Sequence, residues 1–365
     1  MNEELMTCSD DGSVKTWTVD SFDQKYEFSY QGSGDRCDFF ETSTNNDIVL
    51  VLFKYTNPNY NDSNMPTTTQ NNNEISFNNQ INTLLNTSLN QNQFNSSSIT
   101  SFIRVYHLKK MKVVGKISIP DNGVFINNFK LIFNGNGLLL TTYQDKIYII
   151  NVKNWDPLNL LYTETNSSFM PKNQLFKHID CYDTDNKNSV CSMSFSNGTT
   201  VVLSLRLESN RVNQEVMDMF NLFEYQIGKS DDLTTTELFK NLTKYRTNYV
   251  ATAVFSKTWK KILFCFHECL QFLFLRNVST KEIYRRIPLN YFPVCMTLSK
   301  DEEYVSIGTK EGKLLFIKRL EDNPNSGFNL DVISGHYSTV KSLSFIQESS
   351  ALVSASHSEM IVWDI

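Results

Sequence analysis

The chain has 365 residues, with 34 Lys and Arg against 39 Asp and Glu, so its formal net charge is −5. This mild acidity argues against a general nucleic-acid binder, which normally carries a strong basic excess. The amino terminus shows no secretory signal, no apolar run is long enough for a membrane helix, and the seven cysteines lack disulfide-framework spacing. We therefore expect a soluble chain with free thiols, in the cytoplasm or nucleus.

Short apolar runs separated by turn residues recur along the whole chain, which predicts a protein built from β-strands. In the first half we expect strands in three groups, at 5–9, 14–19 and 26–30; at 37–41, 48–55, 102–108 and 113–119; and at 126–133, 138–143, 146–152 and 158–164. In the second half we expect four more groups, at 176–182, 189–194 and 201–207; at 249–256, 261–266, 270–276 and 281–287; at 292–298, 304–309, 314–320 and 328–333; and over 335–365. Grouping at this spacing indicates a repeated unit.

Recognisable motifs stand at the two ends of the chain. A Gly-His pair at 335–336 is followed by strand-like runs and a Trp-Asp pair at 363–364, and an Asp-Asp-Gly turn at 10–12 precedes Trp17. These segments resemble the WD-repeat family, whose unit is a four-stranded propeller blade of about 40–45 residues. The resemblance implies an all-β fold, a β-propeller of about seven four-stranded blades over residues 1–365.

The resemblance also implies a polar network that ties each blade together. In the family, the imidazole of the Gly-His pair bonds an Asp in the turn between the second and third strands. It also reaches a Ser or Thr on the second strand and the Trp of the third. Near the end of this chain the roles fall to His336, to Ser354 or Ser356, and to Trp363. The turn at 356–359 lacks the Asp, so this network is expected to be incomplete.

At the start of the chain, Ser9, Asp11 and Trp17 take the same roles, and no Gly-His pair precedes them. The start thus supplies second, third and fourth strands, whereas the end supplies first, second and third strands. Two explanations remain open: a three-stranded blade on each side of the seam, or a chain that is part of a longer, tandem-propeller protein.

Two segments interrupt the period of strands. Residues 57–101 consist mainly of Asn, Thr, Ser and Gln. Such a tract buries too little apolar surface to offset the entropy of ordering it, so we expect a disordered loop within the second blade. A binding or assembly role for the tract is the less favoured alternative.

The second interruption covers residues 208–246, after the fourth blade. Val212, Val216 and Phe220 recur at helical spacing, and Thr234 to Glu237 matches a capping box. The pattern predicts a helical insertion that decorates the blade edge, with a docking helix for a partner as the alternative.

Motifs for catalysis, cofactors or metals do not assemble along the chain. Cys265, His267 and Cys269 would share one face of a strand, a conceivable zinc corner, but a fourth ligand is lacking nearby and the segment is very apolar. We predict a non-catalytic scaffold or adaptor without cofactor, whose propeller loops and faces bind other proteins.

Two further functions are weighed against this one. Arg285 and Arg286 lie where phosphoinositide-binding propellers carry a Phe-Arg-Arg-Gly motif, which would imply a peripheral membrane protein. Ile287 replaces the glycine, and alternation along a strand would separate the two side chains. A ubiquitin-ligase substrate receptor would carry Trp-Asp-X-Arg, which the sequence at 363–365 does not supply.

Overall fold

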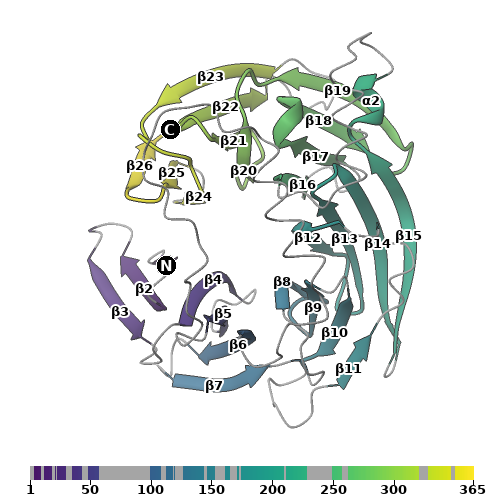
Figure 1. Cartoon of the computed structure of the whole chain (residues 1–365), viewed down its shortest axis with the longest axis vertical. Helices are drawn as coiled ribbons and strands as arrows, with labels where there is room; N and C mark the ends of the chain where they lie inside the picture. Colours follow the sequence, from purple (N-terminus) through teal and green to yellow (C-terminus); the bar gives the residue numbers. More distant parts are fainter. Residues whose placement is uncertain are drawn as a thin grey trace, which may run out of the picture.

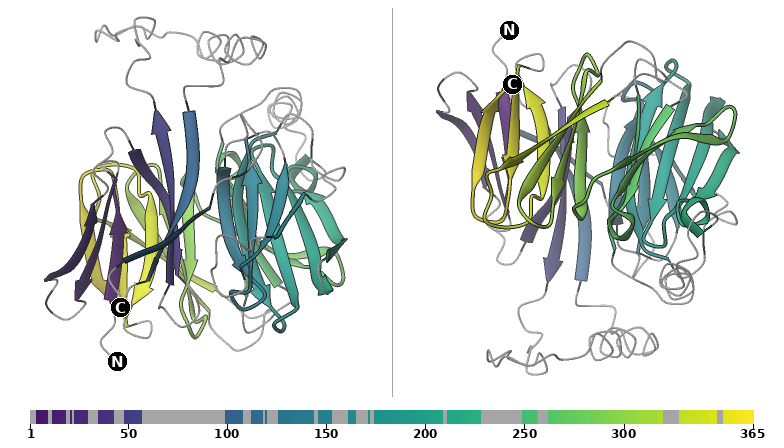
Figure 2. Two further views of the ribbon diagram at one scale, coloured as in Figure 1. Left: turned by 90° about the horizontal axis from the view of Figure 1, so that it is seen from below. Right: turned by 90° about the horizontal axis from the view of Figure 1, so that it is seen from above.

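The computed structural model describes residues 4–9, 12–18, 21, 23–29, 35–42, 48–56, 99–107, 112–117, 119, 126–143, 146–152, 161–164, 171, 174–208, 211–227, 249–256, 262–319, 328–346 and 350–365. Within these residues the strands form seven antiparallel sheets, which are arranged around a ring (Figure 1). The strands run between two faces of the ring, as the side views show (Figure 2).

Five of the sheets have four strands each, paired in chain order. The second sheet has β4 (Asp35–Thr42), β5 (Ile48–Thr56), β6 (Ile99–His107) and β7 (Lys112–Ile117), and the third has β8 (Ile126–Ile132), β9 (Gly137–Thr142), β10 (Ile147–Asn151) and β11 (Leu161–Glu164). The fourth has β12 (Phe176–Asp183), β13 (Asn188–Phe195), β14 (Thr199–Glu208) and β15 (Arg211–Asn221). The fifth has β16 (Ala251–Phe255), β17 (Ile262–His267), β18 (Phe272–Asn277) and β19 (Glu282–Pro288), and the sixth has β20 (Pro293–Leu298), β21 (Tyr304–Thr309), β22 (Lys313–Arg319) and β23 (Phe328–Ser334). In each, the first strand lies nearest the middle of the ring and the fourth lies at the rim (Figure 1).

The first and last sheets have three strands each. They contain β1 (Glu4–Cys8), β2 (Ser13–Thr18) and β3 (Gln24–Ser29), and β24 (Ser342–Ile346), β25 (Ala351–Ala355) and β26 (Met360–Asp364). Trp17 on β2 lies opposite Leu5, and Trp363 on β26 lies opposite Leu352. These two positions are equivalent, so the described strands are the second to fourth of the first sheet and the first to third of the last. This agrees with the strands expected at the two ends of the chain, and the described residues show four-stranded blades in the other five sheets only.

Apolar clusters fill the spaces between neighbouring sheets. In the described part of the chain there is one cluster for each of the six consecutive pairs of sheets. A seventh and smaller cluster joins the last sheet to the first, with Leu5 and Val353 buried and Trp17 and Ile346 packed against them. Middle strands contact clusters on both faces; every residue of β9, for example, is buried.

A buried ion pair also joins the fourth sheet to the fifth. Arg276 on β18 donates from Nε to Asp218 Oδ2 on β15 at 2.8 Å and from a terminal nitrogen to Oδ1 at 3.1 Å. The two side chains are only 2% and 3% exposed. The guanidinium also donates to the hydroxyl of Tyr225 and lies 4.1 Å from the centre of the Phe220 ring. Two-point pairing of this kind fixes the geometry of both charges.

The predicted helical insertion is wrong over β15, which pairs with β14 along its whole length. A β-bulge explains the misleading spacing: Val216 and Asp218 lie opposite consecutive residues of β14, so one extra residue shifts the alternation. As a result Val212 packs toward the third sheet, while Phe220, an even number of residues later, packs toward the fifth.

Other parts of the two predicted insertions lie outside the described residues. Helix α2 (Glu224–Ile227) is a single turn after β15, and residues 228–248 are not described. Strand β5 ends at Thr56 and β6 begins at Ile99, so 99–101 are strand residues rather than loop, and 57–98 are not described. The helical segments in the described ranges, α2 and η4 (Glu268–Leu270), are single turns, and none could reach across a bilayer.

Candidate protein-interaction surface

One face of the ring carries the turns between second and third strands, together with the connections from each fourth strand to the next sheet. In the fifth, sixth and seventh sheets these segments are residues 268–271, 289–292, 310–312, 335–341 and 356–359. We call them the Tyr337 face. Because neighbouring strands run antiparallel, β26 ends at the opposite face of the ring (Figure 2).

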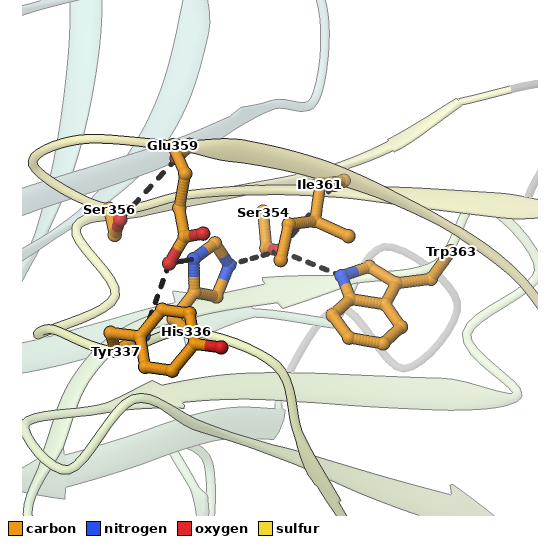
Figure 3. Close-up of polar contacts among 7 residues, drawn as sticks. All are labelled: His336, Tyr337, Ser354, Ser356, Glu359, Ile361 and Trp363. Atoms are coloured by element: carbon orange, nitrogen blue, oxygen red, sulfur yellow. Dashed lines mark hydrogen bonds and ion pairs between the residues drawn. The ribbon is translucent and has the colours of Figure 1, made fainter.

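A polar network underlies this face in the last sheet (Figure 3). The indole of Trp363 donates to Ser354 Oγ at 2.7 Å, and Ser354 Oγ lies 2.6 Å from His336 Nε2. His336 Nδ1 lies 3.3 Å from Glu359 Oε1. One set of roles satisfies all four groups: the serine donates to a neutral imidazole, and the imidazole donates to the carboxylate. Glu359 therefore takes the place of the Asp that the turn lacks, and the network that was expected to be incomplete has a carboxylate.

Ser356, the alternative to Ser354, does not join the network. Its backbone N–H donates to the carbonyl of Glu359 at 2.9 Å, so it stabilises the turn instead. Sequence reasoning missed Glu359 because it required an Asp. A search of the turn for any carboxylate would have found it, since the longer Glu side chain presents the same oxygen.

In the first sheet, Thr7 takes the role of hydrogen-bond partner of the tryptophan that was predicted for Ser9. The Trp17 indole donates to Thr7 Oγ1 at 3.0 Å, whereas Ser9 lies in the turn, where its N–H donates to the Ser13 carbonyl at 3.0 Å. Asp11 lies outside the described residues. Thr7 follows Leu5 by two residues, just as Ser354 follows Leu352, so aligning the two Trp-bearing hairpins would have identified it.

The network holds the backbone of an exposed aromatic residue in place. The Tyr337 N–H donates to Glu359 Oε1 at 3.1 Å, and the Tyr337 side chain is 98% exposed (Figure 3). Gly335 allows the chain to pass the Trp363 indole, since a Cβ there would lie 2.2 Å from a ring atom. A buried and satisfied network thus presents a tyrosine to solvent from a fixed backbone.

Hydrogen bonds connect this loop to the neighbouring ones. Thr339 Oγ1 donates to the Lys310 carbonyl at 3.2 Å, and the Lys310 N–H donates to the Phe292 carbonyl at 2.9 Å. The Phe292 N–H in turn donates to the Glu311 carboxylate at 3.3 Å. Phe292 is 41% exposed. Two exposed aromatic side chains therefore lie on loops that belong to one connected surface.

A pocket of about 350 Å³ opens on this surface between the fifth and sixth sheets, lined by Tyr249, Glu268, Cys269, Phe292 and Lys310. Glu268 Oε2 accepts the Val250 N–H at 3.0 Å, and Oε1 forms an ion pair with Lys310. The Glu268 side chain is 5% exposed and the Lys310 side chain is 50% exposed. Burial, with a smaller contribution from Glu268, raises the pKa of Cys269 to about 12, so its thiol stays protonated at neutral pH.

The residues of the conceivable zinc site, Cys265, His267 and Cys269, take part in packing and hydrogen bonding instead. His267 Nε2 lies 3.0 Å from the Ser196 carbonyl, and Nδ1 accepts the Cys269 N–H at 3.1 Å. Both ring nitrogens are engaged, and burial lowers the His267 pKa to about 4, so the ring is neutral. Across the described ranges no group of three or more side chains could hold a metal ion.

The two arginines of the lipid alternative are not directed to one side. Arg285 lies opposite Leu275 and Arg286 opposite Phe274 in the pairing of β18 with β19. Leu275 belongs to the cluster facing the sixth sheet and Phe274 to the cluster facing the fourth. The Arg286 guanidinium lies 5.8 Å from the centre of the Phe272 ring. Consecutive strand residues point to opposite faces, so the two cations do not form one phosphate grip.

The sheets, their ring arrangement and the loops at two faces define a β-propeller. No protein-family model and no curated protein matches the chain. Among solved structures, it is similar to the β-propeller domain of Cps50 (Swd1) from Myceliophteria thermophila, with TM-score 0.63 and 8% identity over 100% of this chain and 93% of that one. It is also similar to a chain of the mitotic checkpoint complex, with TM-score 0.57 and 9% identity over 100% and 88%. The β-propeller fold is the one that the resemblance implied.

Proposed function

We propose that the protein is a non-catalytic scaffold, a seven-bladed propeller that binds protein partners through the Tyr337 face. The observation that carries this proposal is the near-complete exposure of Tyr337 on a loop held by the buried network beneath it. Large aromatic side chains are enriched at the centres of protein interfaces, where they bury much area at low entropic cost. A preformed loop lowers that cost further.

The neighbours support a binding role without specifying the partner. One similar chain comes from a multiprotein assembly, the mitotic checkpoint complex. Fold alone does not establish function, so the proposal depends on the exposed aromatics and not on the neighbours. Five cysteines are free thiols, Cys181, Cys191, Cys265, Cys269 and Cys295, which supports an adaptor working in the reducing cytoplasm or nucleus.

The experiment is quantitative affinity purification of the tagged chain from its native cells, with a Tyr337→Ala, Phe292→Ala variant. Tyr26→Ala is the matched control, because Tyr26 is a 36% exposed tyrosine on the rim strand β3. We expect a stoichiometric set of proteins that the double variant loses and the control retains. A set that the double variant keeps in full, or a purification without any partner, would refute the proposal.

A further inference from the structure

The pocket beside Phe292 has the chemistry of a site for a cation. Its lining includes two aromatic residues, Tyr249 and Phe292, and its charged residues are Glu268 and Lys310. Glu311, whose carboxylate accepts the Phe292 N–H, adds a second negative charge at the rim. Two carboxylates against one ammonium leave a local excess of negative charge, and aromatic faces also attract cations.

The carboxylate of Glu268 is oriented in advance. It is almost fully buried, and the Val250 N–H fixes one of its oxygens at 3.0 Å. The other oxygen carries the ion pair with Lys310. Binding a cation on this oxygen would need no rearrangement of the Glu268 side chain, which favours a tight contact.

The side chain of Lys310, a residue of the protein itself, pairs with Glu268 where a bound cation would otherwise lie. Its backbone is held by Phe292 and Thr339, but its side chain is half exposed and contacts Glu268 only through the flexible end. An ion pair made by such an exposed lysine stabilises its paired state only weakly, so competition from Lys310 should weaken the binding of another cation by about twofold to fivefold at most. A cation that also stacks on the two rings would gain more than Lys310 loses.

We propose that this pocket takes an arginine side chain of a protein partner, and that Lys310 pairs with Glu268 until the arginine displaces it. The inference rests on the proposed function, because it names the chemistry of a partner at the same face. A guanidinium fits better than an ammonium, since its planar group stacks on aromatic rings while its edge donates to a carboxylate. Thr339 links the pocket to the loop of Tyr337, so one partner segment could cover both.

The test uses the full-length chain and a capped Gly-Ala-Arg-Ala-Gly peptide, observed by NMR titration of the arginine side-chain signals. The control peptide has citrulline in place of arginine, which keeps the shape and removes the charge. Glu268→Gln should weaken binding by about tenfold, because the carboxylate charge is lost and the guanidinium keeps only a neutral amide oxygen as acceptor. Phe292→Leu should weaken it by about twofold to fivefold.

The decisive variant is Lys310→Gln, which should strengthen binding by about twofold to fivefold, because the competing ammonium is gone. Lys313→Gln is the matched control: it removes one positive charge from β22 beside the same turn, where Lys313 contacts Ser334. We expect no comparable gain from it. Thermal unfolding of each variant establishes that it is folded.

Weaker binding by Lys310→Gln, or equal binding of the citrulline peptide, would overturn the arginine site. The proposed function is judged separately by partner capture with the single variant Tyr337→Ala, which leaves the pocket residue Phe292 in place. If capture depends on Tyr337 while the arginine peptide does not bind, only the inference fails. If the peptide binds as described and no partner is captured, the proposed function fails.

Discussion

Ser354→Ala should destabilise the propeller more than any other single removal of a hydroxyl group from the Trp-bearing hairpins. Ser354 is fully buried and contacts both the Trp363 indole and the His336 imidazole. Its removal leaves two polar groups without a partner, at about 1–3 kcal/mol each. The indole is part-buried and can gain water, so we expect a total of about 2–4 kcal/mol.

The first sheet supplies the matched comparison. Thr7→Ala removes the acceptor of the Trp17 indole alone, so one part-buried group loses its partner, at a cost of about 1–2 kcal/mol. Urea unfolding followed by tryptophan fluorescence gives both values from the shift in midpoint. A Thr7→Ala loss equal to or larger than the Ser354→Ala loss would refute the idea that the imidazole depends on Ser354. Ser354→Ala should also weaken partner capture without altering the surface, because it loosens the loop of Tyr337.

Three further predictions concern other parts of the ring. Asp218→Leu or Arg276→Met alone should lower the free energy of unfolding by about 3–5 kcal/mol, because each leaves a buried charge unpaired. The double variant should recover most of this loss. Urea unfolding measures all three values, and a double variant whose loss equals the sum of the two single losses would contradict the prediction. The pKa of His267 is lowered from 6.5 to about 4, so between these pH values the unfolded chain binds a proton that the folded chain does not. The free energy of unfolding should therefore fall as the pH drops from about 6.5 to 4. Urea midpoints that stay constant across this pH range would contradict the prediction. Gly335→Ala should lower the stability of the fold more than Gly135→Ala. A Cβ at 335 would lie 2.2 Å from the Trp363 indole, while one at 135 would meet nothing within 4 Å and bring only the strain of a positive φ. Differential scanning calorimetry measures the unfolding temperature of both variants, and a lower value for Gly135→Ala would contradict the prediction.

The polar network could be predicted where residue identity marks the role. His336 and Trp363 were found because the family resemblance assigns one role to each of these residue types. Thr7 and Glu359 were missed because their roles depend on register and on side-chain length. The pairing register of a hairpin can be inferred from the sequence when two hairpins are aligned on a residue that both contain, here the tryptophan.

The helical assignment of β15 failed for a different reason. A strand is recognised by strict alternation, and the bulge at Val216 to Asp218 breaks that alternation in the middle of the strand. What remains is a set of apolar residues at mixed intervals, which fits a helical period. Pairing with β14 decides the outcome, and pairing is a tertiary property that a single segment does not encode.

The pocket was beyond prediction, since its residues come from separate parts of the chain. Tyr249 precedes the fifth sheet, Glu268 lies in its central turn, and Lys310 lies in a turn of the sixth. None belongs to a motif, and only the packing of adjacent sheets brings them together. The exposed Tyr337 was likewise unmarked, because exposure depends on the surrounding loops.

The small cluster between the last and first sheets has a consequence for how the ring assembles and comes apart. Its residues, Leu5 and Trp17 on one side and Ile346 and Val353 on the other, come from opposite ends of the chain, so joining them carries a larger loop-closure entropy than joining any two consecutive sheets. Among the described residues it also has fewer buried side chains than the other clusters to offset that entropy. We therefore expect this junction to form last during folding and to open first, and we expect a partner that bridges it to stabilise the closed ring.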